Sequence, residues 1–392
     1  MLLHQWGALL LDTPVIKVFG PAFAAVDGRK AMITPRHLLL HEAGFPPDPT
    51  PTSYCAPNFA CPETARQPSD RRLTFSCQPK AFEHLVHSQR LDREPGLRFV
   101  YSDLSMITLM NVVGSLAERG GHVTKDELLP ACLHHDEGTH EGSIVEGDTR
   151  DGNVGSGNGG IAATSIAQCY YEAFARKFIF DKLRNTAGAS PSGAGLSSFF
   201  GFRLPRALAP CAAPTWNDTV DGFPGECIVP YRRRVLQGEV SDGNAFALGG
   251  VAGHAGLFAS APLIHALVVQ AGLLFAPPSG QPLGGLGISP ATVKLFTTVH
   301  DARRSSRALG WDTLAPPFGG SLCGNMSELT FTHTGYTGTL VCADPQTRGG
   351  LLTVLLTNRV YPKADDVSER AIHKARVLFN SAVLASLAVS NR

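Results

Sequence analysis

Residues 328–358 read ELTFTHTGYTGTLVCADPQTRGGLLTVLLTN, and this stretch decides the fold. It holds three short runs that are typical of strands: Glu328–Phe331, Thr339–Ala343 and Gly350–Asn358. The turn Asp344–Gly349 joins the last two runs, and Asp366–Leu387 beyond them predicts a long helix. Short strands followed by a helix predict an antiparallel sheet backed by helices, in an α/β (α+β) fold class.

The region upstream of the sheet is predicted to be mostly helical. Met32–Gly44 carries helix signals at both ends, with Thr34 as N-cap, Pro35 in the first turn and Gly44 as C-cap. Met1–Leu11 is typical of the tail of a buried helix that ends at Gly7. Apolar periodicity predicts four more helices: Ala81–Leu91, Leu104–Arg119, Ile166–Arg184 and Ala261–Leu274.

We therefore expect one domain over residues 1–392 with two parts. Residues 16–300 are predicted to form a mostly helical subdomain, and residues 301–392 hold the sheet and the C-terminal helix. The helical part carries two insertions. Residues 46–72 are rich in Pro, Ser and Thr, and residues 132–160 include a low-complexity run, so both are predicted to be loops.

The composition excludes several classes of protein. The chain carries 34 Lys+Arg against 33 Asp+Glu, and 43% of its 392 residues are hydrophobic. This apolar content suffices for a large core and argues against disorder. The balanced charge argues against a nucleic-acid partner, because neutralising phosphates needs clustered basic residues.

Targeting and redox signals are sparse. The apolar runs Ala266–Ala276 and Val377–Val389 fall short of the roughly 20 residues that a spanning helix needs, so no membrane span is predicted. No basic region or cleavage-site pattern follows Met1, so we expect no secretory signal. The nine cysteines are odd in number and form no Cys-x-x-Cys pair. A disulfide framework is therefore not expected, and a reducing, cytoplasmic compartment is favoured.

Three segments carry residues that suit catalysis. The first is Tyr101-Ser102-Asp103, just before a predicted helix. Ser102 or Asp103 could simply cap that helix. Alternatively, Tyr101 could act as a general base, if cationic neighbours lower the pKa of its phenol.

The second segment, residues 333–339 (HTGYTGT), combines a titratable side chain with hydroxyls and two glycines that permit close backbone approach to a ligand. The alternative is a glycine-rich hairpin whose hydroxyls bond the local backbone. The third segment, residues 242–258 (DGNAFALGGVAGHAGLF), places His254 in a glycine-dense turn. There a buried, hydrogen-bonded histidine is the alternative to a catalyst. His37 and His41 are predicted to share one helix face and to pack or hydrogen-bond locally.

Four motifs occur in this order along the chain: MITPRHLLLHEAGF, YSDLSMITL, GNAFALGGVAGHAGLF and HTGYTGTLVCADP. Together they resemble the serine β-lactamase-related family, which includes class C β-lactamases, DD-peptidases and esterase-like relatives. The resemblance runs from Met1 to about Leu387. RHLLLHEAG is similar to the family's RHLLTHTSG, with Glu42-Ala43 in place of Thr-Ser, and TNRVYP at Thr357–Pro362 also looks like the family.

The resemblance implies a nucleophilic acyl-transfer site. Tyr101 and Asp103 match the family's second proton relay, and His333-Thr334-Gly335 matches the sheet edge that faces the nucleophile. The backbone N–H of Tyr336 would then serve the oxyanion hole. The expected catalytic residues are Tyr101, Asp103 and His333, and the expected substrate-binding residues are Ser102, Thr334, Gly335, Tyr336 and His254.

The family's Ser-x-x-Lys motif, which supplies the nucleophile and a lysine base, is absent. No lysine has Ser or Thr three residues before it, and Cys77-Gln-Pro-Lys80 has the spacing but a proline inside the helical turn. The order Gly7, Leu11, Asp12, Pro14 resembles the segment that follows this motif in the family. We therefore expect the chain to begin partway down the nucleophile helix, with three strands where the family has five, and to be poorly stable alone.

Three functions remain open. The protein is a serine hydrolase acting on an ester, amide or β-lactam, of which this chain is a truncated and inactive version, or it is a non-catalytic pseudoenzyme that binds or scaffolds. The third alternative is another nucleophile or a metal, for which one cluster offers ligands without fixed geometry: His134, His135, Asp136, Glu137 and His140.

The expected partner is a small-molecule or peptide substrate, no cofactor is implied, and no motif fixes the oligomeric state. Histidine rather than lysine at position 333 lowers the fixed positive charge facing a substrate carboxylate. This substitution favours an ester or peptide over a penicillin-like anion.

Overall fold

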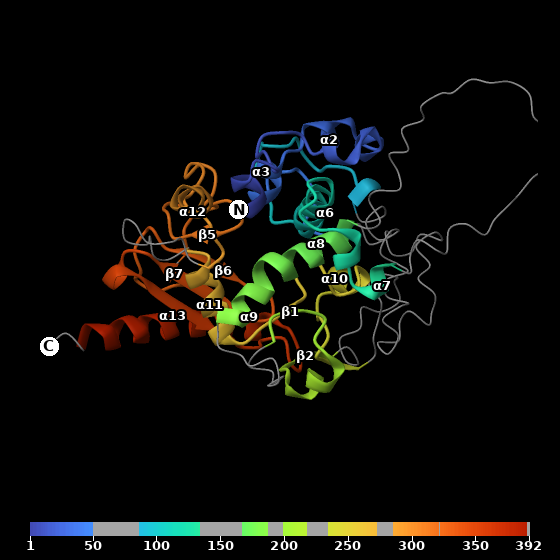
Figure 1. Cartoon of the computed structure of the whole chain (residues 1–392). Helices are drawn as coiled ribbons and strands as arrows, with labels where there is room; N and C mark the ends of the chain where they lie inside the picture. Colours follow the sequence, from blue (N-terminus) through green and yellow to red (C-terminus); the bar gives the residue numbers. More distant parts are fainter. Residues whose placement is uncertain are drawn as a thin grey trace, which may run out of the picture.

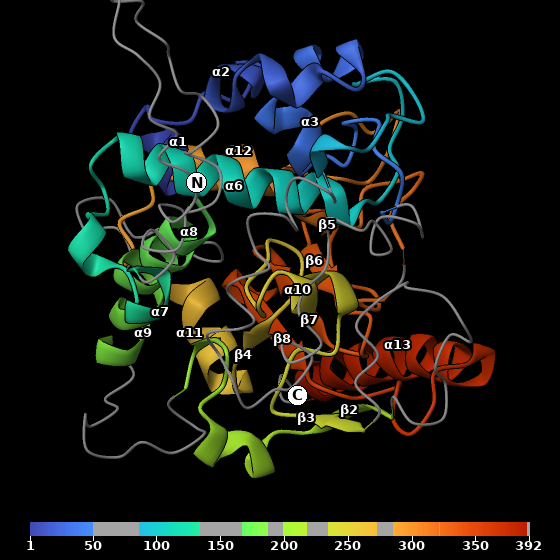
Figure 2. The same ribbon diagram turned by 90° about the vertical axis from the view of Figure 1, so that its right-hand side faces the viewer.

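The computed structural model describes residues 1–49, 86–133, 167–186, 199–217, 234–272, 285–320 and 322–389. In these residues the main sheet and the C-terminal helix form one part of the molecule, and most of the helices form the other. Figure 1 shows the two parts in the colours of the chain, and Figure 2 shows them from the side. This arrangement matches the mixed helix-and-sheet fold expected from the sequence.

The main sheet is antiparallel, with the strand order β5-β6-β7-β8. Its strands are β5 (Asp312–Thr313), β6 (Phe331–Thr334), β7 (Leu340–Asp344) and β8 (Leu351–Leu355). Two of the three predicted strands are confirmed as β7 and β8, whereas the predicted strand Glu328–Phe331 overlaps β6 only at Phe331. The expectation of three strands is nevertheless corrected to four, because a strand of two residues such as β5 is too short to leave an alternating pattern.

The two faces of this sheet meet different parts of the molecule. Side chains alternate between faces along a strand, and Phe331 pairs with Ala343 while His333 pairs with Val341. Phe331, Val341 and Ala343 pack into the main core together with side chains of the helical part. His333 shares their face because it lies two residues after Phe331. The sheet therefore directs His333 toward the helical part.

The other face of the sheet is covered by α13 (Asp366–Val389), which confirms the predicted closing helix. Buried Ile372, Arg376 and Asn380 recur every four residues and mark the face of α13 that packs on the sheet. The amide of Asn380 accepts a hydrogen bond from Thr353 of β8. By length and composition α13 could also cross a membrane, and only 17% of its most apolar window is buried in the fold. One such helix is weak evidence for a membrane span. The absence of a membrane span stays a prediction.

The described residues of the helical part contain three of the four helices that the apolar periodicity predicts. They are α6 (Asp103–Arg119), α8 (Ala167–Ala175), which continues through a π-helical turn (Arg176–Phe180) into α9 (Asp181–Thr186), and α11 (Ala261–Gln270). The remaining short helices are α1 (Leu2–Gln5), α2 (Ile16–Phe19), α7 (Pro130–Leu133), α10 (Gly243–Ala247) and α12 (Pro290–Thr297). Two small ladders complete the described strands: β1 (Gly201–Phe202) with β4 (Leu257–Phe258), and β2 (Pro214–Asn217) with β3 (Val235–Gln237).

Helix α3 (Pro35–Leu39) begins as predicted, with Thr34 as N-cap in a capping box. It ends earlier than predicted, with Leu40 as C-cap, so Gly44 does not cap it. Gly44 is instead required by close packing, because a Cβ there would lie 2.3 Å from the carbonyl oxygen of Arg93. His41 lies beyond the helix with a left-handed φ of 54°. The expectation that His37 and His41 share one helix face is therefore wrong.

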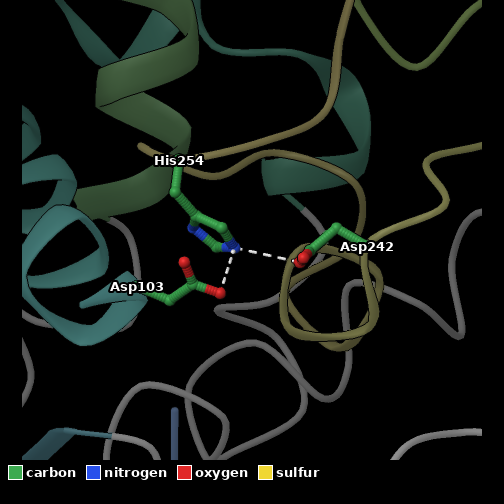
Figure 3. Close-up of side chains that lie close together, drawn as sticks. All are labelled: Asp103, Asp242 and His254. Carbon is green, nitrogen blue, oxygen red and sulfur yellow. Dashed lines mark hydrogen bonds and ion pairs between the residues drawn. The ribbon is translucent and has the colours of Figure 1, made fainter. Parts of the chain in front are cut away.

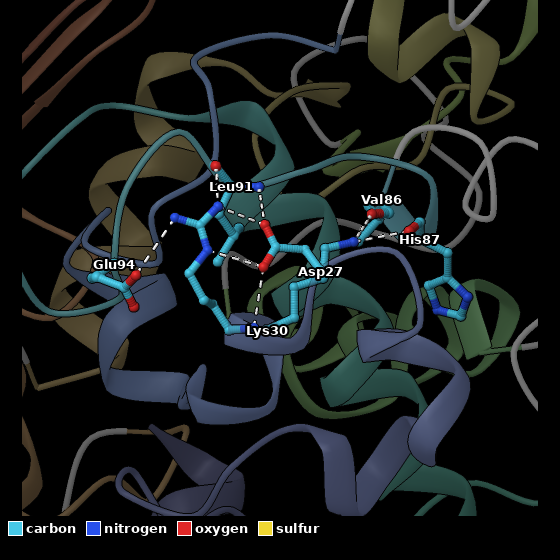
Figure 4. A network of polar contacts seen from close by, with 7 residues as sticks. Asp27, Lys30, Val86, His87, Leu91 and Glu94 are labelled. Atoms are coloured by element: carbon cyan, nitrogen blue, oxygen red, sulfur yellow. Dashed lines mark hydrogen bonds and ion pairs between the residues drawn. The ribbon is translucent and has the colours of Figure 1, made fainter.

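A buried polar network anchors the segment that leads to Tyr101 (Figure 4). The carboxylate of Asp27 accepts a hydrogen bond from the backbone N–H of Leu91 at 3.0 Å. The fully buried ammonium of Lys30 donates to the carbonyl oxygens of Val86 and His87 at 2.8 and 2.9 Å. Burial lowers the pKa of Lys30 to about 8. These bonds fix residues 86–91 against the N-terminal helices.

Two disulfides correct the expectation drawn from the cysteine pattern. Cys132 of α7 is bonded to Cys169 of α8, and Cys323 is bonded to Cys342 of β7. The partners are 37 and 19 residues apart, so no local motif reveals them. The preference for a reducing compartment loses its basis, because disulfides are typical of oxidising ones.

Several predicted features fall outside the described residues. They are most of the helix Ala81–Leu91, most of both insertions, the cluster from His134 to His140, and the Cys77–Lys80 segment.

Candidate active site

The segment Tyr101-Ser102-Asp103 is held at the start of α6 by the loop that follows α3. Ser102 is the N-cap of α6 and is fully buried, and its hydroxyl donates to the carbonyl oxygen of Pro46 at 2.6 Å. Its backbone N–H donates to Nδ1 of His41 at 3.1 Å. Ser102 therefore caps α6, as one of the two interpretations of the sequence predicts. A role of Ser102 in substrate binding stays a prediction.

Tyr101 lies against the ring of His41, with ring centroids 4.4 Å apart in a stacked arrangement. About 40% of the Tyr101 surface remains exposed, so a ligand can reach it. Burial of its phenol and the nearby charge of Asp103 raise the pKa of Tyr101 to about 12, while Arg307 opposes them. The expectation of a lowered pKa is therefore wrong, because burial of the phenol and the nearby carboxylates together outweigh the charge of Arg307.

Asp103, Asp242 and His254 meet in one cluster, shown in Figure 3. Nε2 of His254 lies 2.9 Å from Oδ1 of Asp242 and 3.4 Å from Oδ2 of Asp103. Asn244 adds a hydrogen bond from Nδ2 to Oδ2 of Asp103 at 3.0 Å. The side chain of His254 is only 3% exposed. The structure thus places His254 as a buried, hydrogen-bonded histidine, and its predicted contact with substrate remains untested.

Close packing of a glycine brings this cluster together. A Cβ on Gly253 would lie 2.3 Å from the carbonyl oxygen of Met106 in the first turn of α6. Only glycine allows the loop to approach the helix this closely. Gln168 of α8 also holds this loop, because its side-chain amide donates to the carbonyl oxygens of Leu248 and Val251. His254 is consequently fixed beside Asp103.

The proton affinities of the cluster depend on each other. Burial raises the pKa of Asp103 to about 6, and the charge of His254 opposes this shift. Burial by itself would lower the pKa of His254, but the hydrogen bond and charge of Asp242 together with the charge of Asp103 outweigh burial and raise it. A protonated His254 between two carboxylates is the arrangement that these effects favour.

The same three side chains are the described group that could hold a metal ion, because their ligand atoms lie within 4.8 Å of one another. A metal-ligating histidine normally donates its other ring N–H to an acceptor. Nδ1 of His254 is buried and lacks such a partner in the part of the chain that the structure describes. The cluster therefore fits a hydrogen-bonded group better than a metal site.

His333 lies on β6, on the sheet face that meets the helical part. Its Nδ1 is 2.9 Å from the carbonyl oxygen of Thr334. Burial, and then the charge of Arg307, lower the pKa of His333. His333 is therefore uncharged at neutral pH, in line with the reduced fixed charge expected from the sequence.

The turn after β6 is held in shape by a hydrogen bond within it and by two from α13. The N–H of Gly335 donates to the carbonyl oxygen of Thr339 at 2.9 Å. The guanidinium of Arg376 on α13 donates to the carbonyl oxygens of Gly335 and Thr339 at 3.0 and 2.9 Å. Arg376 is only 5% exposed, so these bonds form in a buried setting. Thr334 and Gly335 are thereby fixed beside His333.

Tyr336 projects from this turn and is 65% exposed. Its ring stacks near Trp216 of β2 at 6.5 Å, and the guanidinium carbon of Arg359 lies 4.3 Å from the ring centroid. Nε of Arg359 also donates to the carbonyl oxygen of Tyr336 at 2.8 Å. These contacts fix the backbone of Tyr336. A fixed backbone N–H is what a hydrogen-bond donor of an oxyanion hole requires.

The sequence reasoning missed two residues of the site, His41 and Arg307. The guanidinium carbon of Arg307 lies 5.9 Å from the ring centroid of Tyr101, and the charge of Arg307 also acts on the pKa of His333. For His41 the sequence predicts only local packing or hydrogen bonding. The RHLLLHEAG motif contains His41, but no local pattern shows that its ring stacks on Tyr101.

Comparison with known proteins adds a family match. A model described as Beta-lactamase matches residues 1–377. A putative D-alanyl-D-alanine carboxypeptidase of Escherichia coli (strain K12) is 37% identical over 157 residues, which is 38% of this chain and 32% of that protein. An N-acetylmuramyl-L-alanine amidase of Bacillus subtilis (strain 168) is 31% identical over 158 residues, covering 39% of this chain and 32% of that protein. The matches thus span about a third of the length of these relatives.

Among solved structures, a penicillin binding protein from Bacillus halodurans aligns over 95% of this chain and 81% of its own, with 15% sequence identity and a TM-score of 0.49.

Proposed function

The chain belongs to the beta-lactamase family, and from this premise we propose that its site serves a serine hydrolase that works through an acyl-enzyme. The substrate is an ester, amide or β-lactam. The observation that supports this proposal most is the placement of Tyr101. Its accessible phenol lies beside the Asp103–His254 pair on the helical part, and Arg307 links it electrostatically to His333 on the sheet.

The proposed roles follow from the protonation states. In the reaction, the lysine of a Ser-x-x-Lys segment takes the serine proton, the serine oxygen bonds to the acyl carbon, the bond to the leaving group breaks, and the leaving group takes up a proton. When water later cleaves the acyl-enzyme, the lysine returns the proton to the serine oxygen. Tyr101 is protonated at neutral pH because its pKa is about 12, so its phenol can deliver that proton and regain one from the attacking water. Asp103, hydrogen-bonded to Asn244, fixes the start of the helix that carries the relay.

The sheet edge supplies the complementary groups. An uncharged His333 can donate or accept a hydrogen bond at the substrate, and the hydroxyl of Thr334 lies next to it. The backbone N–H of Tyr336 would stabilise the negative charge that develops on the acyl oxygen. Ser102 and His254 are buried, so we propose that they act by supporting Tyr101 and Asp103.

These 392 residues contain no Ser-x-x-Lys. We propose that this chain by itself forms no acyl-enzyme, since a hydroxyl needs an adjacent base to become nucleophilic. A fluorophosphonate probe and a fluorescent penicillin test this directly. Neither should label the 392-residue chain, and mass spectrometry of a labelled peptide within residues 1–392 would contradict the proposal.

A chain extended at its N-terminus by a segment that carries Ser-x-x-Lys should hydrolyse a chromogenic ester. In that protein Tyr101→Phe and His333→Ala should each lower kcat/KM by about 10²-fold or more, because each removes a proton-transfer or binding group. Tyr171→Phe on α8 is the matched control, since it removes a buried hydroxyl next to Phe202. Wild-type turnover in Tyr101→Phe would remove Tyr101 from the mechanism.

The second candidate is a non-catalytic binding protein, and the missing nucleophile motif favours it. In this case the site would bind an ester or peptide without converting it. Saturation-transfer NMR on the 392-residue chain should then detect ligand contact that Tyr336→Ala weakens. Turnover in the extended chain would exclude this candidate for the natural protein.

A further inference from the structure

The positive charge nearest to Tyr101 comes from Arg307, in the loop between α12 and β5. Its guanidinium carbon lies 5.0 Å from the ring centroid of Phe99 and 5.9 Å from that of Tyr101. The side chain is 15% exposed, so its charge is screened by water less than that of a surface arginine. Arg307 therefore lies against the side of the site that the helical part forms and that carries Tyr101, which we call the helical wall; the opposite side, which carries His333 on β6, is the sheet wall.

Arg307 is also tied to the sheet wall. Its NH2 lies 3.4 Å from Oδ2 of Asp312, and Asp312 pairs in register with Thr332 next to His333. The backbone carbonyl of Arg307 accepts a hydrogen bond from the N–H of His300 at 3.0 Å, which fixes its loop. One guanidinium thus spans the two walls that carry Tyr101 and His333.

We propose that Arg307 is the fixed positive charge of this site and serves both walls, Tyr101 on one and His333 on the other. This inference rests on the proposed function, since it assigns Arg307 as a positioning residue that acts through Tyr101. Because His333 is uncharged at neutral pH, a permanent positive charge between the two walls comes from the arginine, which remains charged at any working pH.

The charges around Tyr101 show why this cation matters. Asp103 on α6, Asp242 before α10 and Asp48 in the loop after α3 all raise the pKa of its phenol. His41, which stacks on Tyr101, accepts the N–H of Ser102 and is uncharged. Arg307 is the cation among the described groups that act on Tyr101. Without it, the three carboxylates would raise the pKa of Tyr101 further.

The charge of Arg307 acts in the same direction on three groups: it lowers the pKa of Tyr101, His333 and His41. At the 5.9 Å between the guanidinium carbon and the ring centroid of Tyr101, with an effective dielectric constant of about 20, a full charge shifts the pKa of Tyr101 by roughly two units, and the pairing with Asp312 reduces this to about one. A lower proton affinity lets Tyr101 release its proton more readily during turnover.

The test measures proton affinity in the 392-residue chain itself, so it needs no turnover. Difluorotyrosine, whose phenol is more acidic than that of tyrosine, is incorporated and titrated by ¹⁹F NMR, with the Tyr101 resonance assigned from Tyr101→Phe. The Cε1–H of His333 is titrated by ¹H NMR. Arg307→Gln should raise the pKa of Tyr101 by about one unit and should also raise that of His333, and Arg307→Lys should restore at least half of each shift.

Arg303→Gln is the matched control, because Arg303 carries the same charge in the same loop but is 90% exposed. It should leave both titrations within about 0.2 units of wild type. If Arg307→Gln fails to fold, Arg307→Met takes its place, because it keeps an unbranched side chain against the ring of Phe99 but carries no charge. This change should raise the pKa of Tyr101 and of His333.

Unchanged titrations in folded Arg307→Gln, or a shift of His333 without one of Tyr101, would overturn the inference. So would an equal shift in Arg303→Gln. Failure of the proposed hydrolase activity is a different result, because it would appear as absent turnover in the extended chain while the titration shifts persist.

Discussion

Replacing Asp242 distinguishes two contributions of its carboxylate to stability: the charged hydrogen bond with His254 and the cap on α10. Oδ1 accepts a hydrogen bond from Nε2 of His254 at 2.9 Å and another from the backbone N–H of Ala245 at 2.7 Å, which caps α10. Asparagine can still cap a helix but carries no charge, whereas alanine loses both functions. The two variants therefore divide the stabilisation into an ionic and a capping contribution.

The magnitudes follow from the geometry. A hydrogen bond to a charged group contributes about 1.5–3 kcal/mol, and because a third of the Asp242 side chain is exposed we take the lower end, about 1.5 kcal/mol. Loss of the cap costs about 1 kcal/mol more. At pH 5.5 we expect Asp242→Asn to lower the free energy of unfolding by about 1.5 kcal/mol, and Asp242→Ala by about 2.5 kcal/mol.

The pH dependence has a definite sign. The pKa of His254 is raised in the folded state, so its stabilisation is complete below the unfolded pKa of about 6.5 and is lost as pH rises through the folded value. At pH 9 the cost of Asp242→Asn should therefore fall to about 0.5 kcal/mol, the contribution of a neutral hydrogen bond. The difference between the two variants should stay near 1 kcal/mol at both pH values.

Urea unfolding followed by circular dichroism at pH 5.5 and pH 9.0 measures all four quantities. An equal cost of Asp242→Asn at the two pH values would show that His254 is not charged in the cluster, and the ionic argument would fail. Equal costs of the asparagine and alanine variants would show that the cap on α10 contributes nothing.

Three further predictions concern the supports of the site. Removing the Cys323–Cys342 disulfide, which closes a loop of 19 residues, by the double change Cys323→Ala and Cys342→Ala should lower the free energy of unfolding by about 3 kcal/mol, measured by urea unfolding against a Cys211→Ser control that leaves both described disulfides intact. Gly253→Ala should destabilise by about 1–3 kcal/mol and displace His254, because the new Cβ would lie 2.3 Å from a backbone oxygen of α6; an unchanged melting temperature and unchanged His254 NMR shifts would refute this. Arg376→Leu should cost about 2 kcal/mol and speed amide exchange at Tyr336, because the turn loses two buried hydrogen bonds, whereas the same exchange rate as wild type would show that the turn holds itself.

Local sequence patterns were sufficient for the starts of two helices beside the site. The capping residues Ser102 and Thr34 mark the starts of α6 and α3, whereas the predicted strand Glu328–Phe331 ends before His333, so the place of His333 in β6 was not predicted. Such patterns are readable because caps and periodicity depend on residues a few positions apart. The motifs around Tyr101, His254 and His333 identified the family from the sequence alone.

The tertiary structure decided how these side chains affect one another. Asp103, Asp242 and His254 come from different segments, and only packing of Gly253 against α6 brings their charges within 3.4 Å. The raised pKa of Tyr101, the position of Arg307 beside Tyr101 and the two disulfides were likewise decided by the tertiary structure. Electrostatic and covalent contacts depend on distances in space, and those distances are set by the packing of segments far apart in the chain rather than by the spacing of residues within any one of them.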